Sequence, residues 1–230
     1  MEIIIPKHGK HSRYSTIFFD FGGVLSPPLE VLFQSYEEKT GIKKEELANA
    51  MYSVAKEMEI PTLAPIELAL LTEEEWMIRI HSWLNKRKID TSKSDLDFGR
   101  QWFSGHEVNG SMKELLLKLK ASGYRVGILT NNVREWEPYW RSMVCLDDHV
   151  DAIIDSYAVG VRKPDPGIFH LAAEKISSDP NQCILIDDLM ENCLSAESCG
   201  WSPVQFSSNK QVIQDIIGLL RQEVKDDSHD

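Results

Sequence analysis

Short apolar runs alternate along the chain with longer stretches in which apolar residues recur at helical spacing. Four of these runs have the composition of buried strands: 16–19, 124–129, a weaker one at 152–154, and 183–186. Helical stretches separate or follow the later runs, one beginning at Ser111, one at Asp165 and a last one covering about 210–224. Gly123 is suited to end the first of these helices. Strands that alternate with helices in this way are typical of a parallel α/β sheet.

The stretch between the first two strands, from residue 27 to about residue 105, shows helical spacing only. Thr72 and Glu75 form a capping box at the start of one of its helices, and Ser111 and Glu114 form a second box just beyond the stretch. We therefore predict an α/β fold, a Rossmann-like parallel sheet core with helices on both faces and an all-helical cap inserted after the first strand. The predicted parts are a core of residues 15–27 and 106–230, a cap of residues 28–105, and a flexible N-terminal extension of residues 1–14.

Polar residues follow the predicted strands directly. They are Asp20 with Gly22 and Gly23, Thr130 with Asn131 and Asn132, the run Arg162–Pro166, and Asp187 and Asp188 with Asn192. Each group alone is also typical of a helix cap or a turn. Because ligands of open α/β sheets bind at the carboxyl ends of the strands, the four groups together predict one binding site at that edge.

The order of these motifs resembles the haloacid dehalogenase superfamily over nearly the whole chain. Four motifs carry the resemblance: Ile17–Leu25, Leu129–Asn131, Lys163–Pro166, and Ile184–Asp188 followed by Asn192, Ala196 and Gly200. The first motif is most similar to that of a subgroup including the N-terminal phosphatase domain of soluble epoxide hydrolases and related sugar phosphatases. The resemblance implies a Mg²⁺-dependent phosphohydrolase that acts on a small phosphorylated metabolite through an aspartyl-phosphate intermediate.

The resemblance also implies a role for each motif residue. Asp20 is the expected nucleophile, and Thr130 and Lys163 complete the catalytic set. The expected ligands of Mg²⁺ are Asp20, the backbone carbonyl of Gly22, Asp188 as a direct ligand, and Asp187 as a direct or water-mediated one. The expected partners of the phosphoryl oxygens are Thr130, Asn131, Lys163 and Gly23.

Gly22 departs from the pattern of the superfamily. Phosphatases of this group usually carry a second Asp at this position, two residues after the nucleophile, as general acid and base. Loss of such a group typically slows a reaction by about 10²–10⁴-fold unless another residue serves, with His81 and His106 as candidates. The alternative function is therefore a non-hydrolytic or lyase-type protein that binds a phosphate or diphosphate. A dehalogenase, in which the Asp attacks carbon without a metal, is disfavoured by the paired acids Asp187 and Asp188.

Charge and composition disfavour several classes of partner. The 25 Lys and Arg residues against 36 Asp and Glu residues give a net charge of −11, which disfavours nucleic acid and anionic membranes. No apolar run approaches the ~20 residues that span a bilayer, and the pattern of a secretory signal is absent. The four cysteines form no CxxC pair, so we expect reduced thiols in a cytoplasmic protein, either a monomer or a homodimer.

Two groups of residues allow both a structural and a functional interpretation. Trp76, Trp83 and Trp102 in the cap are able to form an aromatic wall at the site, but packing of a small helical cap explains them better. Trp136 and Trp140 are likewise expected to pack along a helix. We interpret the run 73–75, three glutamates, as the acidic first turn of a helix.

Overall fold

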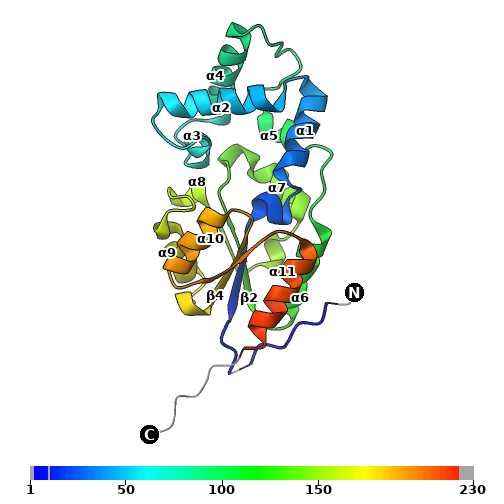
Figure 1. Ribbon diagram of the computed structural model, residues 1–230, viewed down its shortest axis with the longest axis vertical. Coiled ribbons are helices and arrows are strands. Elements are labelled where there is room, and N and C mark those ends of the chain that lie inside the picture. Colours follow the sequence, from blue (N-terminus) through cyan, green and yellow to red (C-terminus); the bar gives the residue numbers. More distant parts are fainter. Residues whose placement is uncertain (1–2, 10, 223–230) are drawn as a thin grey trace.

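The structure, a computed structural model, describes residues 3–9 and 11–222 (Figure 1). One parallel sheet has the strand order β3-β2-β1-β4-β5. The strands are β1 Thr16–Phe19, β2 Arg125–Thr130, β3 Ala152–Asp155, β4 Cys183–Asp187 and β5 Ser202–Gln205. This confirms the predicted Rossmann-like parallel sheet. The predicted end of the last helix near Val224 lies outside the described residues.

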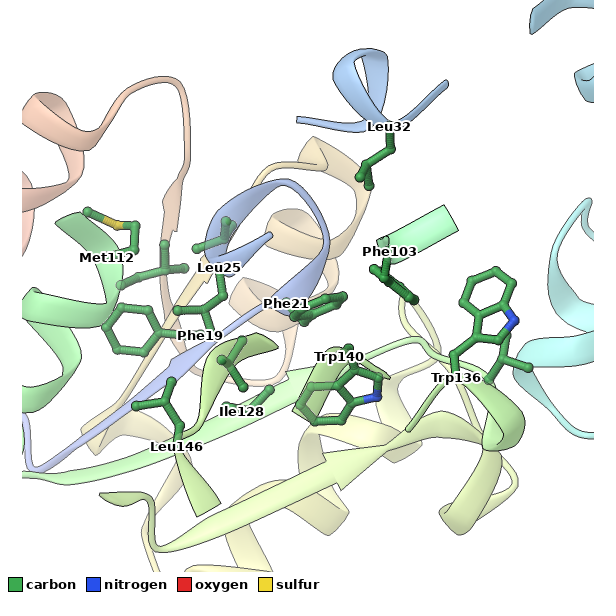
Figure 2. Close-up of a cluster of buried hydrophobic side chains, with 14 of the residues drawn as sticks. Phe19, Phe21, Leu25, Leu32, Phe103, Met112, Ile128, Trp136, Trp140 and Leu146 are labelled. Atoms are coloured by element: carbon green, nitrogen blue, oxygen red, sulfur yellow. The ribbon is translucent and has the colours of Figure 1, made fainter. Parts of the chain in front are cut away.

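The central strand β1 is buried over its whole length, which explains why its sequence is continuously apolar rather than alternating. Successive side chains point to opposite faces of a sheet, and the two phenylalanines of β1 follow this rule. Phe18 packs against Phe169 and Trp201 on one face. Phe19 belongs to the larger cluster on the other face, together with Ile128 (Figure 2). The sheet therefore has a hydrophobic core on each side.

Helices cover both faces of the sheet, as predicted, with α9 and α10 on one side and α6 and α11 on the other (Figure 1). The helices of this part are α6 Gly110–Ala121, α7 Glu137–Val144, α8 Ser156–Val159, α9 Pro166–Lys175, α10 Met190–Ser198 and α11 Asn209–Leu220. Single turns of other types cover Phe21–Leu25, Arg134–Trp136, Asp147–His149 and Pro180–Gln182. Among the described residues, no helix combines the length and the apolar character that crossing a membrane requires.

A group of helices follows the first strand, as predicted. These are α1 Leu29–Thr40, α2 Lys44–Glu57, α3 Ala64–Glu67, α4 Glu73–Lys86 and α5 Phe98–Phe103. Figure 1 shows them gathered beyond the carboxyl ends of the strands, at the end of the molecule far from the N-terminus. We refer to this group as the cap helices. They lie above the edge of the sheet where the sequence places the polar motifs.

The start of a helix was predicted correctly where the capping contact is local, and incorrectly where a residue far away in the chain determines it. The capping box of Thr72 and Glu75 is present and opens α4. The second predicted box is wrong, because α6 begins at Gly110 after Asn109, whose backbone N–H donates to the carbonyl of Leu25. The N-cap of α6 therefore lies two residues earlier than Ser111, the N-cap that the predicted box requires.

Strand β5 was not predicted. Its four residues, Ser202–Gln205, include a proline and are only partly buried, so no apolar run marks them. Proline lacks the N–H that an interior strand needs, and it is tolerated here because β5 lies at the edge of the sheet. The neighbouring strand β4 and helix α10 supply the contacts that make this segment a strand.

Candidate active site

Asp20 stands directly after β1, at the carboxyl edge of the sheet. Its backbone N–H donates to the carbonyl of Ile186 at 2.8 Å, which continues the pairing of β1 with β4 by one residue. Its carboxylate oxygen Oδ1 accepts a hydrogen bond from the N–H of Phe21 at 2.7 Å. The side chain is buried. Strand pairing and this short-range bond together hold the carboxylate in one orientation.

The two glycines after Asp20 differ in what the fold requires of them. Gly23 has a φ of +69°, and a Cβ added there would lie 2.5 Å from Oδ2 of Asp188, so no other residue fits without displacing that acid. Gly22 has an ordinary backbone conformation, with φ −62° and ψ 124°, and an added Cβ would meet no atom within 4 Å. The backbone therefore demands glycine at position 23 but not at position 22.

Three carboxylates meet at this edge. Oxygens of Asp20, Asp187 and Asp188 all lie within 4.8 Å of one another. Burial raises the pKa of Asp20 well above its ordinary value, and the charges of Asp187 and Asp188 add to this rise, while Lys163 opposes it. Burial and the charge of Asp187 also raise the pKa of Asp188. A cluster of hard oxygen donors with more negative charge than its one lysine neutralises suits a small divalent cation such as Mg²⁺.

Lys163 is the counter-ion of this cluster. Its side chain is buried, and its Nζ lies 2.9 Å from Oδ1 of Asp20 and 2.5 Å from Oδ2 of Asp187. Burial by itself would lower the pKa of Lys163, but the two carboxylates outweigh it and raise the pKa above its ordinary value. The ammonium group is therefore charged, and it ties the end of β1 to the end of β4.

Asp187 and Asp188 differ in how many of their oxygens are already used. Oδ1 of Asp187 accepts hydrogen bonds from the backbone N–H of Leu189 and from the side chain of Asn192, and its Oδ2 contacts Lys163. Asp188 lines the cavity above the cluster, and among the described residues its side chain has a hydrogen bond only from its own backbone N–H. Asp188 is thus the fourth-motif acid with oxygens available to a ligand.

The predicted phosphate-binding residues are only partly free to bind phosphate. The side chain of Asn131 donates to the carbonyl of Lys163 at 2.9 Å and accepts from the Lys163 N–H at 2.8 Å, so it braces the lysine loop. The N–H of Gly23 donates to Oγ of Ser26. Thr130, at the end of β2, is buried, and within residues 3–9 and 11–222 its hydroxyl has no hydrogen-bond partner. Of these three, Thr130 keeps its side-chain donor unused.

A cavity of about 220 Å³ opens between this cluster and the cap helices. Its polar floor is formed by Asp20, Lys163 and Asp188. Apolar side chains form most of the wall: Leu29, Leu32, Leu63, Trp102, Phe103 and Trp136. Figure 2 shows Leu32, Phe103 and Trp136 of this wall beside Phe21, whose backbone continues from the nucleophile position. Five of these six apolar residues belong to residues 28–105, so the cap contributes most of the apolar side chains named here.

The tryptophans divide between packing and the cavity. Trp76 and Trp140 are fully buried and pack as expected. Trp102 packs against Phe98 and also lines the cavity. Trp136 lines it too, although the sequence indicated only packing. Because Trp136 follows β2 and contacts cap residues, its position depends on contacts that helical spacing does not report.

Two other acidic residues make contacts that the sequence did not indicate. Glu73 lies in the acidic first turn of α4, as predicted, but it is buried. Its Oε1 accepts hydrogen bonds from Nε1 of Trp136 and from the N–H of Gly99, both at 2.6 Å. Burial raises the pKa of Glu73 to about 7. Glu67 lines the cavity and pairs with Arg162. Neither residue belongs to one of the four motifs, so the sequence did not indicate these buried contacts.

The histidines considered as replacements for the missing acid do not line the cavity. Nε2 of His81 lies 2.8 Å from Oγ of Ser94, away from the acidic cluster. Nε2 of His106 is buried without a hydrogen-bond partner in the described part of the chain. Of the described residues around the cavity, the carboxyl groups besides Asp20 are those of Asp188 and Glu67.

A family model described as a haloacid dehalogenase-like hydrolase matches residues 14–200. Acyl-CoA dehydrogenase family member 10 of Mus musculus is 25% identical over 217 residues, which cover 93% of this chain and 20% of that protein. Glyceraldehyde 3-phosphate phosphatase of Pyrococcus abyssi is 31% identical over 132 residues, which cover 50% of this chain and 54% of that protein. The chain therefore spans about a fifth to a half of the length of these relatives.

Solved structures of similar fold agree with the family match. One of them is a haloacid dehalogenase family enzyme of Bacteroides thetaiotaomicron in complex with magnesium and inorganic phosphate. It superimposes with a TM-score of 0.60 at 22% sequence identity, over 84% of this chain and 93% of that chain. At this identity the likeness establishes the fold.

Proposed function

The chain belongs to the haloacid dehalogenase-like hydrolases, and on that basis we propose that it is a Mg²⁺-dependent phosphohydrolase that cleaves a small phosphorylated metabolite through an aspartyl-phosphate intermediate. One observation carries the proposal: the carboxylates of Asp20, Asp187 and Asp188 converge at the carboxyl edge of the sheet, and Lys163 contacts two of them. A phosphatase among the relatives and a structural neighbour bound to magnesium and phosphate support the same chemistry.

In the proposed reaction the carboxylate of Asp20 attacks the phosphorus atom, the ester P–O bond breaks, and the leaving oxygen takes a proton from water. Water then attacks the phosphorus of the aspartyl phosphate, which releases inorganic phosphate and restores the free carboxylate. Oδ1 of Asp20 is held by the N–H of Phe21 and by Lys163, so the nucleophile is oriented before the substrate arrives. Lys163 also reduces the repulsion between the carboxylates and an incoming phosphoryl group.

The proposed Mg²⁺ ligands are the carboxylates of Asp20 and Asp188 and the backbone carbonyl of Gly22. When bound, the ion would supply positive charge that neutralises the nucleophile and the phosphoryl oxygens. Asp187 has partners on both of its oxygens and therefore suits an indirect, water-mediated role. Thr130, with its unused hydroxyl, is the proposed side-chain donor to the phosphoryl oxygens.

A second candidate function is the binding of a phosphate or diphosphate without hydrolysis, or a lyase reaction. The observation that favours it is the absence of a carboxyl group at Gly22, together with the positions of His81 and His106 outside the cavity. In this case the metal and phosphate pocket would be retained while proton transfer to the leaving group is lost.

The proposal extends to the molecule as a whole. Residues 28–105 would act as a cap that covers the leaving group, which the position of the cap helices above the cavity supports (Figure 1). All four cysteines are free thiols, which is consistent with a reducing, cytoplasmic environment. We propose a monomer or a homodimer.

Hydrolysis of 4-nitrophenyl phosphate and a panel of phosphorylated metabolites, with and without Mg²⁺, tests the proposal. Asp20→Asn keeps the size of the side chain but removes the nucleophile, and we expect it to lower kcat by more than about 10³-fold. Asp215→Asn, on the exposed side of α11, is the matched control and should leave the rate unchanged. Equal activity of Asp20→Asn and wild type, or activity that ignores Mg²⁺, would contradict the proposal.

A further inference from the structure

The cavity wall is mostly apolar, and it contains one ion pair outside the acidic cluster. Of the described residues that line the cavity, the charged ones outside the acidic cluster and its lysine are Glu67 and Arg162. The rest of the wall above the floor is largely aliphatic and aromatic. A charged pair in such a wall is costly to desolvate unless its groups have partners, so its presence calls for a reason.

The ion pair joins the cap helices to the loop that carries the lysine. Nε of Arg162 lies 2.6 Å from Oε2 of Glu67, and the Glu67 side chain is 9% exposed against 22% for Arg162. Glu67 is the last residue of α3, and its backbone carbonyl accepts a hydrogen bond from Oγ of Ser156 at 2.7 Å. Ser156 therefore holds the backbone of Glu67 in place, and the Glu67 carboxylate holds the guanidinium group of Arg162.

The guanidinium group of Arg162 has hydrogen-bond donors that Glu67 does not use. In the described part of the chain, Arg162 donates through Nε only, while Nη1 and Nη2 have no hydrogen-bond partner and are not sealed from solvent. By contrast, the ammonium group of Lys163 is buried between two carboxylates. Arg162 is thus the cation at the cavity that can still accept an anion. A planar guanidinium favours a carboxylate or phosphate, to which it donates two parallel hydrogen bonds.

We infer that Arg162 binds a second anionic group of the substrate and that Glu67 is the positioning residue that orients it. The substrate class is then a phosphate ester whose leaving group has an apolar or aromatic body and carries a carboxylate or a second phosphate. The ester phosphate lies at the acidic cluster, the apolar body against the wall, and the second anion at Arg162. This inference rests on the proposed function for the site of the ester phosphate.

Three synthetic substrates test the inference: phenyl phosphate, 4-carboxyphenyl phosphate and 1,4-phenylene bisphosphate. They share one apolar ring and differ only in the second group. Because hydrogen bonds to charged groups are stronger than those between neutral groups, we expect kcat/KM to be at least about tenfold higher for one or both substrates that carry the second anionic group. Which of the two shows the preference tells a carboxylate from a second phosphate.

For each variant, kcat/KM for the preferred substrate is divided by kcat/KM for phenyl phosphate. A general loss of activity cancels in this ratio. Arg162→Met should bring the ratio close to one, and Arg162→Lys should restore only part of it because the fork geometry is lost. Arg79→Met removes one positive charge from an exposed position on the cap helices and should keep the wild-type ratio. Glu67→Gln should raise KM for the preferred substrate with little change in kcat, and Glu67→Ala should raise it further.

Binding of phosphonates keeps the test independent of hydrolysis. Phenylphosphonate and 4-carboxyphenylphosphonate, or the corresponding bisphosphonate, are titrated calorimetrically into wild type and Arg162→Met in the presence of Mg²⁺. Tenfold tighter binding of a phosphonate with a second anionic group, if it depends on Arg162, supports the inference even when no ester is hydrolysed. In that event the proposed function alone fails. Equal affinities and equal rates for all members of the series would overturn the inference.

Discussion

Gly22→Asp is expected to raise the phosphatase rate for substrates with poor leaving groups. The backbone at position 22 is ordinary, and a Cβ there meets no atom within 4 Å, so the fold accepts the new side chain without strain. The added carboxyl group would stand two residues after the nucleophile, where phosphatases of this family usually carry their general acid. General acid catalysis contributes about 10²–10⁴-fold, and we expect a gain of about 10²-fold in kcat/KM.

The assay compares an alkyl phosphate with 4-nitrophenyl phosphate. A proton donor assists departure of an alkoxide strongly and departure of nitrophenolate weakly, so the gain in kcat/KM should be confined to the alkyl ester. Gly22→Asn has nearly the same shape but no proton to give, and it should show no gain. An equal gain in both variants would refute the reasoning. No gain for a folded Gly22→Asp that still binds Mg²⁺ would show that another group already serves.

A substitution at position 23 is expected to behave differently from one at position 22. Gly23→Ala places a Cβ 2.5 Å from Oδ2 of Asp188 and requires an unfavourable positive φ of +69°. We expect it to raise the Mg²⁺ concentration needed for half-maximal activity, whereas Gly22→Ala should leave that concentration unchanged. Equal Mg²⁺ dependence of the two alanine variants would contradict the proposed position of the metal.

Three further predictions concern buried charged groups. Lys163→Met removes the cation from two buried carboxylates and should lower the free energy of unfolding in EDTA by about 3–5 kcal/mol, as measured in urea, with partial recovery in Mg²⁺. Burial raises the pKa of Asp155 to about 8 from 3.8, so folding favours its protonated form and wild type loses stability as pH rises from about 4 to 8. Asp155→Asn should remove this loss, whose slope is at most about 1.4 kcal/mol per pH unit. The free energy of unfolding is measured by urea titration at a series of pH values. Parallel curves of this free energy against pH for wild type and Asp155→Asn would contradict the raised pKa of Asp155. Glu73→Ala leaves two buried N–H groups, one of them on Trp136, without an acceptor and should destabilise by about 2–5 kcal/mol, whereas Glu73→Gln should cost less than half as much.

Features that depend on neighbouring residues could be predicted from the sequence. The apolar run before Asp20 predicted β1, and the spacing of Thr72 and Glu75 predicted the start of α4, because the contacts involved are within one strand or one turn. The topology of a parallel sheet then brings the carboxyl ends of β1, β2 and β4 to one edge. The meeting of Asp20, Lys163 and the paired acids follows from that rule.

Features that depend on residues far away in the chain could not be predicted from the hydrophobic pattern. The edge strand β5 and the start of α6 depend on partners elsewhere in the fold. Asn131 braces the lysine loop, and Glu73 holds Trp136, because the packing of the chain leaves those partners within hydrogen-bond distance. Hydrophobic periodicity reports which face of an element is buried, but it does not report what that face meets.

The sequence by itself determined the parallel α/β architecture and the acidic cluster at its edge, because both follow from local propensity and from the fixed direction of parallel strands. The tertiary structure alone decided the cavity above that cluster. Its mostly apolar wall and the ion pair within that wall combine cap residues with core residues far away in the chain, as Glu67 with Arg162 shows. Such pairs form only when the chain has folded, since long-range packing and the burial of charge select them.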